Sequence, residues 1–170
     1  MDADTRRKQI LSMVDKPGAL ISASALAKIL NVSRQIVVGD IALLRAQGHE
    51  IIATARGYMI PRFKESGQYL GKIACNHTPE KTAFELYAMV DSGAIVVNII
   101  VEHELYGEIT GNLNLSNRED VDYFMDKVEV SGTKLLSELT SGSHLHTVAC
   151  RDKNHFDKLC EILRERSIEK

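Results

Sequence analysis

Along the first 48 residues of the chain, apolar side chains recur every three or four positions, which predicts three consecutive helices. Residues that favour helix ends separate these segments. Pro17-Gly18 ends the first helix, and either Ser22 or Ser24 can cap the second. Ser33 can cap the third helix, which Gly48 closes. The apolar positions are, in chain order, Ile10, Leu11, Val14, Leu26, Ile29, Leu30, Val37, Ile41 and Leu44.

A hairpin is predicted after the third helix, in the segment HEIIATARGYMIP. Residues 50–53 and 58–60 have the character of strands, and the sequence TARG between them can turn. A short helix, a tight connection, a longer helix and a hairpin follow one another in a winged helix-turn-helix. Arg56, near the hairpin tip, could then contact a phosphate or enter an AT-rich minor groove. The alternative is a helical pair and a hairpin with no role in DNA binding.

From residue 68 onward, strand patterns alternate with helix patterns. The polar segment 62–67 is typical of a linker, so we expect a DNA-binding domain over residues 1–61 and a second domain over 68–170. The fold class is α+β: a winged helix-turn-helix followed by an α/β sandwich-type domain, an open sheet with helices on one face. The expected strands cover 68–76, 94–103, 106–115 and 143–150, and the expected helices cover 78–93, 117–130 and 152–167.

Charge is distributed unevenly between the two parts. Residues 1–65 contain ten lysines and arginines against six acidic residues, although the whole chain has a formal net charge of −2. A basic N-terminal part on an acidic remainder favours contact between that part and a polyanion such as DNA. The apolar runs are too short to span a membrane and the N-terminus has no apolar signal segment, so we expect a cytoplasmic protein without membrane contact. The three cysteines are widely spaced and are expected to be reduced and buried.

The N-terminal part resembles the winged helix-turn-helix of biotin-repressor-like regulators over the residues SASALAKILNVSRQIVVGDIALLRAQGHEIIATARGYMI. The form VSRQ…DIALLRAQG…GY within it is similar to that of bacterial niacin-responsive repressors. The resemblance implies that Arg34 and Gln35 read bases, since arginine suits the O6/N7 edge of guanine and glutamine suits adenine. Ser33 and Arg45 are the expected phosphate contacts.

Two histidines in the segment SGSHLHTV are candidates for a metal site. Alternate residues of a strand face the same side, so His144 and His146 would point one way. His77 lies between a strand end and a helix start, and Glu85 lies about two turns into that helix. Three imidazoles and one carboxylate are a plausible ligand set for zinc, nickel, iron or manganese, without any cysteine.

Each of these residues also has an ordinary structural interpretation. A His-x-His pair on a strand is often two half-exposed polar residues. Glu85 can pair with Lys81 at i, i+4, and His77 can be a turn residue. The remaining histidines are expected on the solvated surface; they are His49, His103 and His155.

The second part resembles the 3H domain, a family named after three histidines, in the segments NHTPEKTAFEL and LSELTSGSHLHTV. The family pattern is a histidine, a glutamate eight residues later, and then a His-x-His strand. The resemblance, which extends over essentially the whole chain, implies one divalent transition metal per chain, with nickel or zinc favoured over iron or manganese. The matching residues are His77, Glu85, His144 and His146. The loop SGTKLL departs from the proline-rich sequence expected there, which leaves the path of that loop open.

The two resemblances together imply a transcriptional repressor of genes for niacin uptake or NAD synthesis. Such a repressor is a homodimer that binds a palindromic operator in double-stranded DNA, with nicotinic acid or nicotinamide as co-repressor at or near the metal. One alternative is a regulator for which the metal itself is the signal. Another is a metallohydrolase with Glu85 as general base, although the sequence shows no further acid–base cluster, nucleophile elbow or phosphate loop. A repressor fused to a ligase would need a glycine-rich adenylate-binding sequence, so we expect no enzyme.

Overall fold

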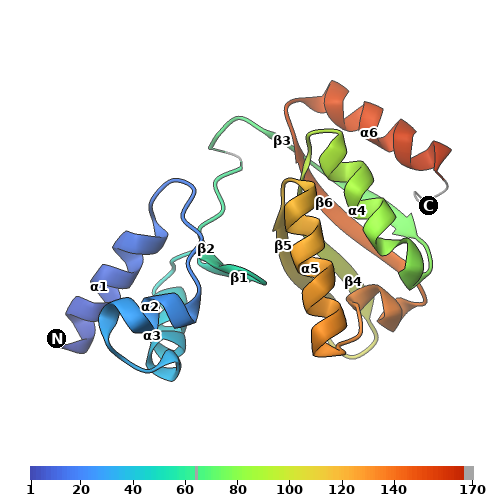
Figure 1. Ribbon diagram of the computed structural model, residues 1–170. Coiled ribbons are helices and arrows are strands. Elements are labelled where there is room, and N and C mark those ends of the chain that lie inside the picture. The colour runs from blue at the N-terminus through green and yellow to red at the C-terminus, as the bar shows by residue number, and fades with distance from the viewer. Residues whose placement is uncertain (64, 167–170) are drawn as a thin grey trace. The chain divides into compact units, whose positions relative to one another are not determined.

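The computed structural model describes residues 1–63 and 65–166 of the chain, which divides into two compact units (Figure 1). The first unit is Met1–Arg62 and the second is Phe63–Lys170. Each unit has a hydrophobic core of its own.

The first unit folds as three helices and a hairpin, which confirms the predicted winged helix-turn-helix. Each helix begins where a side-chain oxygen accepts a backbone N–H three residues ahead, at Asp2, Ser22 and Ser33. Asn31, at φ 53° in the left-handed region, ends the second helix and keeps the connection to the third one short. The elements are α1 (Ala3–Val14), α2 (Ala23–Leu30), α3 (Arg34–Ala46), β1 (Ile52–Thr54) and β2 (Gly57–Met59).

One face of each helix builds the core of the first unit. Among the apolar positions predicted in α2, Leu26 and Leu30 are buried, but Ile29 is 63% exposed. The buried face of α2 is completed by Ala23 and Ala27, because residues spaced by three or four positions share one side of a helix. The predicted core positions of α3 are all buried: Val37, Ile41 and Leu44.

A buried ion pair joins α1 to α3. The carboxylate of Asp40, which is 4% exposed, accepts hydrogen bonds from Arg6 Nε at 2.5 Å and Arg6 Nη2 at 3.2 Å. Arg7 Nη1 lies 3.5 Å from the same carboxylate. Because a carboxylate in a core is unfavourable without a charged partner, this pair fixes how α1 lies on α3.

The second unit is an antiparallel sheet with helices packed on one face, as the sequence predicts. The strand order β3-β6-β4-β5 places β6 inside the sheet, between β3 and β4. Helices α4 and α6 contact these strands, and α5 packs beside α4 (Figure 1). The strands are β3 (Tyr69–Asn76), β4 (Ile95–His103), β5 (Gly107–Leu115) and β6 (Ser143–Cys150). The helices are η1 (Pro79–Lys81), α4 (Thr82–Asp91), α5 (Arg118–Ser131), η2 (Leu136–Thr140) and α6 (Lys153–Glu165), where η denotes a 3-10 helix.

The second unit departs from regular geometry at two places that matter for the site. The helix expected from residue 78 begins as the 3-10 turn η1 and becomes α-helical only at Thr82. Strand β4 contains a bulge, because the register with β6 shifts between Val96 and Asn98 and leaves Val97 without a counterpart.

The core of the second unit lies between the sheet and the helices. All three cysteines belong to it and are free and buried, as predicted: Cys75, Cys150 and Cys160. Burial raises the pKa of Cys150 to about 11, so this thiol stays protonated at neutral pH. Within residues 1–63 and 65–166, none of the helices has both the length and the apolar character that crossing a membrane requires.

The hairpin of the first unit is attached by backbone hydrogen bonds to the connection between α1 and α2, and this attachment requires a glycine. Tyr58 N donates to Ile21 O at 2.8 Å, and Ile21 N donates to Tyr58 O at 3.1 Å. A Cβ atom on Gly57 would lie 2.5 Å from the backbone carbon of Ile21, and Gly57 has φ +144°. A larger residue at this position must therefore displace the hairpin from the helices.

We expect Gly57→Ala to lower the free energy of unfolding of the first unit by about 1–3 kcal/mol, because the added methyl group meets backbone atoms. Chemical denaturation followed by circular dichroism measures this loss. Gly18→Ala is the matched control, since Gly18 also has a positive φ of 72° but its Cβ would meet no atom within 4 Å. Equal losses in the two variants would contradict a steric role for Gly57.

Candidate metal centre

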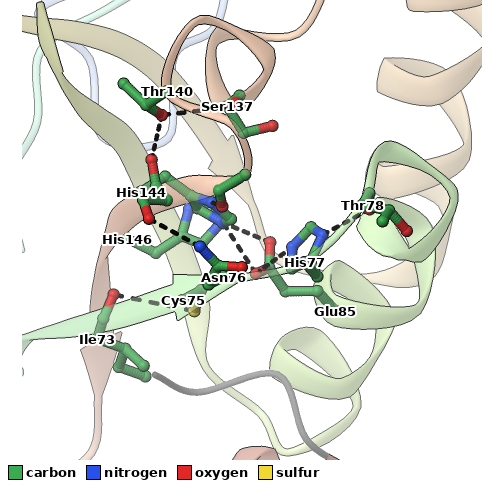
Figure 2. A network of polar contacts seen from close by, with 12 residues as sticks. Ile73, Cys75, Asn76, His77, Thr78, Glu85, Ser137, Thr140, His144 and His146 are labelled. Carbon is green, nitrogen blue, oxygen red and sulfur yellow. Dashed lines mark hydrogen bonds and ion pairs between the residues drawn. The ribbon is translucent and has the colours of Figure 1, made fainter.

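The carboxylate of Glu85 lies among three imidazole rings (Figure 2). Its Oε2 atom is 2.7 Å from His77 Nε2 and 2.9 Å from His144 Nε2. Its Oε1 atom is 2.7 Å from His146 Nε2. All four side chains are only 1–2% exposed. The structure therefore brings together the four residues that the sequence singles out, in a site closed to solvent.

Three elements position these four side chains. His144 and His146 alternate along β6, so both face the helices. Strand β3 pairs with β6 and ends one residue before His77, which places that ring beside His144. Glu85 lies in the first turn of α4, the helix that covers this part of the sheet. Adjacent rings meet edge to face, with centroids 4.9 Å apart for His77 and His144 and 4.8 Å apart for His144 and His146.

The second nitrogen of each ring is held by a backbone carbonyl group. A carbonyl oxygen only accepts hydrogen bonds, so each Nδ1 carries a proton and donates it. The Nε2 atom of each neutral ring is then an unprotonated lone pair directed at the Glu85 carboxylate. The three contacts are His77 Nδ1 to Thr78 O at 2.8 Å, His144 Nδ1 to Gly142 O at 2.8 Å and His146 Nδ1 to Asn98 O at 2.9 Å.

This arrangement has fewer protons than its acceptors require. Three neutral imidazoles use their three protons at the carbonyl groups, and an ionised carboxylate brings none. Lone pairs of nitrogen would then face carboxylate oxygens at 2.7–2.9 Å, which is repulsive. Protonating all three rings would leave an excess of positive charge in a closed site, whereas a divalent cation among these atoms removes the conflict.

The donor set fits such a cation. Imidazoles whose other nitrogen is held by a carbonyl group, together with one carboxylate, are the ligands that zinc and other first-row divalent metals take in proteins. The four residues that could hold it are His77, Glu85, His144 and His146.

In metal-free protein a ring attracts Glu85 only when its Nε2 is protonated, and this attraction shifts the pKa values of the two kinds of group in opposite directions. Burial by itself raises the pKa of Glu85, but the charge of His146 and the hydrogen bonds from the three rings lower it far below the ordinary value of 4.5. Burial lowers the pKa of His77, but the hydrogen bond and charge of Glu85 outweigh it and leave that pKa above the ordinary 6.5. Glu85 is therefore a carboxylate at neutral pH.

Two residues that hold the rings in place are missed by sequence reasoning. Gly142 has φ +95°, and a Cβ atom on it would lie 2.4 Å from the His77 carbonyl oxygen. Asn98 follows the bulge in β4; its carbonyl accepts from His146, and its Oδ1 accepts from Thr147 N at 3.1 Å. Both contact the rings through their backbone carbonyl groups, for which the sequence carries no pattern beyond the glycine itself.

No cysteine is expected at this site from the sequence, but Cys75 lies beside it. Its Sγ atom is within 4.8 Å of ligand atoms of Glu85 and His144. The reason is the strand register, since Cys75 is the cross-strand partner of His144 and faces the same side of the sheet.

The expectation that His155 is a surface residue is wrong. It is 4% exposed, because the start of α6 packs against the end of α4. His155 Nδ1 accepts from Arg151 N at 3.1 Å, and His155 Nε2 donates to Ser92 O at 2.7 Å. The two other histidines expected at the surface are half-buried: His49 and His103.

Three of the residues expected to contact DNA lie together at the start of α3. Ser33 caps this helix, with its hydroxyl accepting from Ile36 N at 3.2 Å. Arg34 and Gln35 follow in the first turn and are exposed. The helix start therefore presents the two expected base readers side by side, and their contact with bases stays a prediction.

The two other expected DNA contacts lie at the hairpin side of the first unit. Arg45 Nε donates to Ile51 O at 2.6 Å, and its guanidinium lies 5.8 Å from the centre of the Tyr58 ring. Arg45 thus links α3 to the hairpin. It is also exposed, so it can still contact a phosphate. Arg56 lies in the turn between β1 and β2 and is half-buried, with its backbone N–H donating to Thr54 Oγ1 at 3.2 Å.

Comparison with known proteins identifies both units. A model of the 3H domain matches residues 71–169, and a model of an HTH domain matches residues 6–59. The chain is 38% identical over 165 residues to a protein named Transcription repressor NadR from Bacillus subtilis (strain 168), which covers 96% of this chain and 92% of that protein. It is 37% identical over 161 residues to a protein named Probable transcription repressor NiaR from Thermotoga maritima, which covers 95% of this chain and 91% of that protein.

The opposite pKa shifts predict how stability depends on pH in protein stripped of metal by a chelator. The raised pKa of His77 contributes stability below about pH 6.5, which is lost as the pH rises through the folded-state pKa. The lowered pKa of Glu85 contributes stability above about pH 4.5, which is lost as the pH falls. We expect the contribution of the pair to be largest at about pH 5–6.

Thermal unfolding of wild type and Glu85→Gln between pH 4 and pH 8 measures this contribution as the difference between the two profiles. In His77→Gln, the fall in stability toward pH 8 should disappear while the fall toward pH 4 remains. This variant therefore separates the contribution of His77 from that of Glu85. If the difference in stability between wild type and Glu85→Gln grew steadily from pH 6 to pH 8, the assignment of this difference to the Glu85–His77 pair would be contradicted.

Proposed function

Because the chain belongs to the family of transcription repressors that combine an HTH domain with a 3H domain, we propose that it represses genes of niacin uptake or NAD synthesis, with nicotinic acid or nicotinamide as co-repressor. The chain is a DNA-binding repressor and not an enzyme, so the metallohydrolase and ligase alternatives are set aside. The repressor acts in the cytoplasm as a homodimer on a palindromic operator. Two copies of α3 then enter the major groove about one duplex turn, ~34 Å, apart.

One divalent transition metal per chain is held by the cluster around Glu85. The observation that supports this most strongly is the approach to one carboxylate of three Nε2 atoms whose rings each contact a backbone carbonyl oxygen through Nδ1, an arrangement that a cation turns into coordination. Nickel or zinc suits the nitrogen-rich set best, and iron or manganese is compatible with it. When bound, the metal supplies a Lewis acid to which a pyridine nitrogen or a carboxylate can bind. The chain's ligands are His77, Glu85, His144 and His146.

The co-repressor is expected in a cavity next to His77. This cavity has a volume of about 480 Å³, which is ample for one pyridine ring. Lys81 and Lys134 place positive charge at its wall, which favours the carboxylate of nicotinic acid over the neutral amide. The rest of the wall is formed by Asn76, Thr78, Pro79, Ser137, Glu138, Ser141 and Gly142.

The segment that contains η2 and Gly142 connects this cavity to the buried cluster. His77 forms part of the cavity wall and of the cluster, and Gly142 lies against its carbonyl group. A ligand in the cavity therefore contacts both the η2 segment and a member of the cluster. It can change operator affinity only by binding one arrangement of the repressor more tightly than another.

Nicotinic acid should tighten operator binding by about 5–150-fold, the usual range of coupling between two sites. Fluorescence anisotropy measures this with a duplex that the protein itself enriches from a randomised pool. In the double variant Lys81→Ala/Lys134→Ala, we expect the half-effective concentration of nicotinic acid to rise at least about tenfold, because the carboxylate loses its charged partners.

Lys72→Ala is the matched control for the two lysines, since Lys72 is exposed on β3 and does not line the cavity. It should respond to nicotinic acid as wild type does. Operator affinity that stays constant over a wide range of nicotinic acid and nicotinamide concentrations rejects the co-repressor.

Purified protein should contain about one equivalent of nickel or zinc per chain, and His146→Ala should lose it. Metal at about 100 times its dissociation constant should stabilise the fold by about 2.7 kcal/mol. This gain should be larger at pH 8 than at pH 6, because protons compete for the imidazoles. Elemental analysis and thermal unfolding with added metal measure both effects. His103→Ala, which changes a half-buried histidine outside the cluster, should keep the metal.

A regulator that responds to the metal itself makes a different prediction for the same protein. Chelation followed by metal re-addition, without any niacin, would then restore full operator affinity. Nicotinic acid would add nothing to it. A further increase of affinity on adding nicotinic acid to metal-loaded protein supports the co-repressor.

A further inference from the structure

Helix α3 exposes three large aliphatic side chains in a unit that buries most of the others. Ile36 is 43% exposed, Val38 is 39% exposed and Leu43 is 50% exposed. Single exposed aliphatic residues are common on protein surfaces, but several on one helix indicate a surface that meets a partner.

The helical repeat shows which residues this surface contains. Successive residues are rotated by about 100°, and the buried side of α3 is defined by Val37, Asp40, Ile41 and Leu44. The opposite side, called here the outer face, consists of Gln35, Gly39, Ala42 and Ala46, all of which are exposed. Val38 lies along one edge of the outer face, and Ile36 and Leu43 lie along the other.

Gly39 lies in the middle of the outer face, where the fold itself does not require a glycine. It is an interior residue of a continuous α-helix, and a Cβ atom on it would meet no other atom within 4 Å. Glycine in the interior of a helix is destabilising relative to alanine, because its backbone is more flexible in the unfolded chain. Its presence here is explained if a partner approaches the helix backbone closely at this point.

The chemistry of this surface matches the major groove of DNA. The second helix of a helix-turn-helix lies in that groove with its N-terminal residues at the base edges, and α3 is this helix. The C5-methyl group of thymine is the apolar group that the base edges present in the major groove. Branched aliphatic side chains can bury this methyl group, while Arg34 at the same end of α3 supplies a cation.

We propose that α3 recognises thymines through Val38 and Ile36, and that Gly39 allows the helix backbone to approach the base edges closely. Leu43, two turns beyond Ile36 on the same edge, extends this contact along the groove. The inference rests on operator binding by the first unit, and it needs neither the metal nor the co-repressor. It adds apolar readout to the polar readout expected of Arg34 and Gln35.

The test uses a duplex enriched from a randomised pool by the wild-type protein and replaces one thymine at a time by deoxyuridine. This exchange removes one methyl group and leaves every hydrogen-bonding atom of the base in place. Burial of one methyl group corresponds to about fourfold in affinity, so wild type should lose about fourfold for each contacted thymine. Val38→Ala and Ile36→Ala should bind the thymine duplex more weakly and should each lose the discrimination at one position.

Ile29→Ala is the matched control, because Ile29 is 63% exposed on α2 rather than on α3. It should keep the wild-type ratio of affinities for thymine and deoxyuridine at each position. A ratio near one for wild type at all thymines of the duplex would overturn the proposal. A change of oligomeric state in Val38→Ala and Ile36→Ala, with the ratios unchanged, would also overturn it and would make this surface a protein interface.

Gly39→Ala tests the close approach through two effects of opposite sign. The variant should raise the Tm of the first unit by roughly 2–8 °C, because alanine favours the helix. It should nevertheless weaken operator binding at least about tenfold, because the added methyl group occupies the space of the approaching base edge. Wild-type affinity in this variant would overturn the proposed approach. If the wild-type protein enriches no sequence from the pool, operator binding itself is contradicted. If it enriches a sequence but binds the thymine and deoxyuridine duplexes equally well, only this inference is contradicted.

Discussion

One buried carboxylate in contact with three imidazoles is the constraint around which the second unit is organised. Glu85 is nearly inaccessible to solvent, and an isolated charge in such a place would be strongly unfavourable. The sheet order places β6, with its two histidines, between β3 and β4. Strand β3 leads into His77 on one side, and β4 supplies the Asn98 carbonyl group on the other. Helix α4 then has to lie across this part of the sheet, because it carries the carboxylate. The polar cluster thereby specifies the arrangement of elements that apolar packing alone would leave less defined.

The two units depend on different kinds of interaction, which agrees with different tasks. The first unit is held by capped helices, a small core and the buried pair of Asp40 with Arg6, and it leaves polar and aliphatic side chains of α3 at the surface. The second unit places its distinctive polar groups inside. The first unit has an exposed surface that suits a long polyanion such as DNA, and the second has a closed interior site that suits a small ion. A regulator needs both parts.

The elements and the shared face of His144 and His146 could be predicted from the sequence, because they follow local rules, whereas the full set of four clustered residues is expected from the resemblance to the 3H domain. Helical and strand periodicity, caps such as Ser33 and the alternation of His144 and His146 depend on neighbours in the chain. The features that could not be predicted depend on distant pairing. Cys75 comes to the cluster through the register of β3 with β6, and His155 is buried by contact between α6 and α4. Every residue has a backbone carbonyl group, so no sequence pattern marks the three that accept hydrogen bonds from the imidazole rings.

The bulge in β4 makes strand length part of the chemistry of the site. The extra residue, Val97, lets the Asn98 carbonyl turn out of the ladder toward His146 and still returns the strand to register with β6. Because Val97 is the residue without a counterpart, a strand that lacked it would pair Val96 with Val148 and Asn98 with Thr147 in direct succession, and the later side chains would keep their faces. Ile99, the cross-strand partner of His146, would still face the helices, and only the local irregularity of the backbone before Asn98 would be lost. The irregularity is thus what an idealised redesign of this sheet would remove first, and such a sheet would keep its strand pairing and its core but lose the carbonyl group that supports one imidazole.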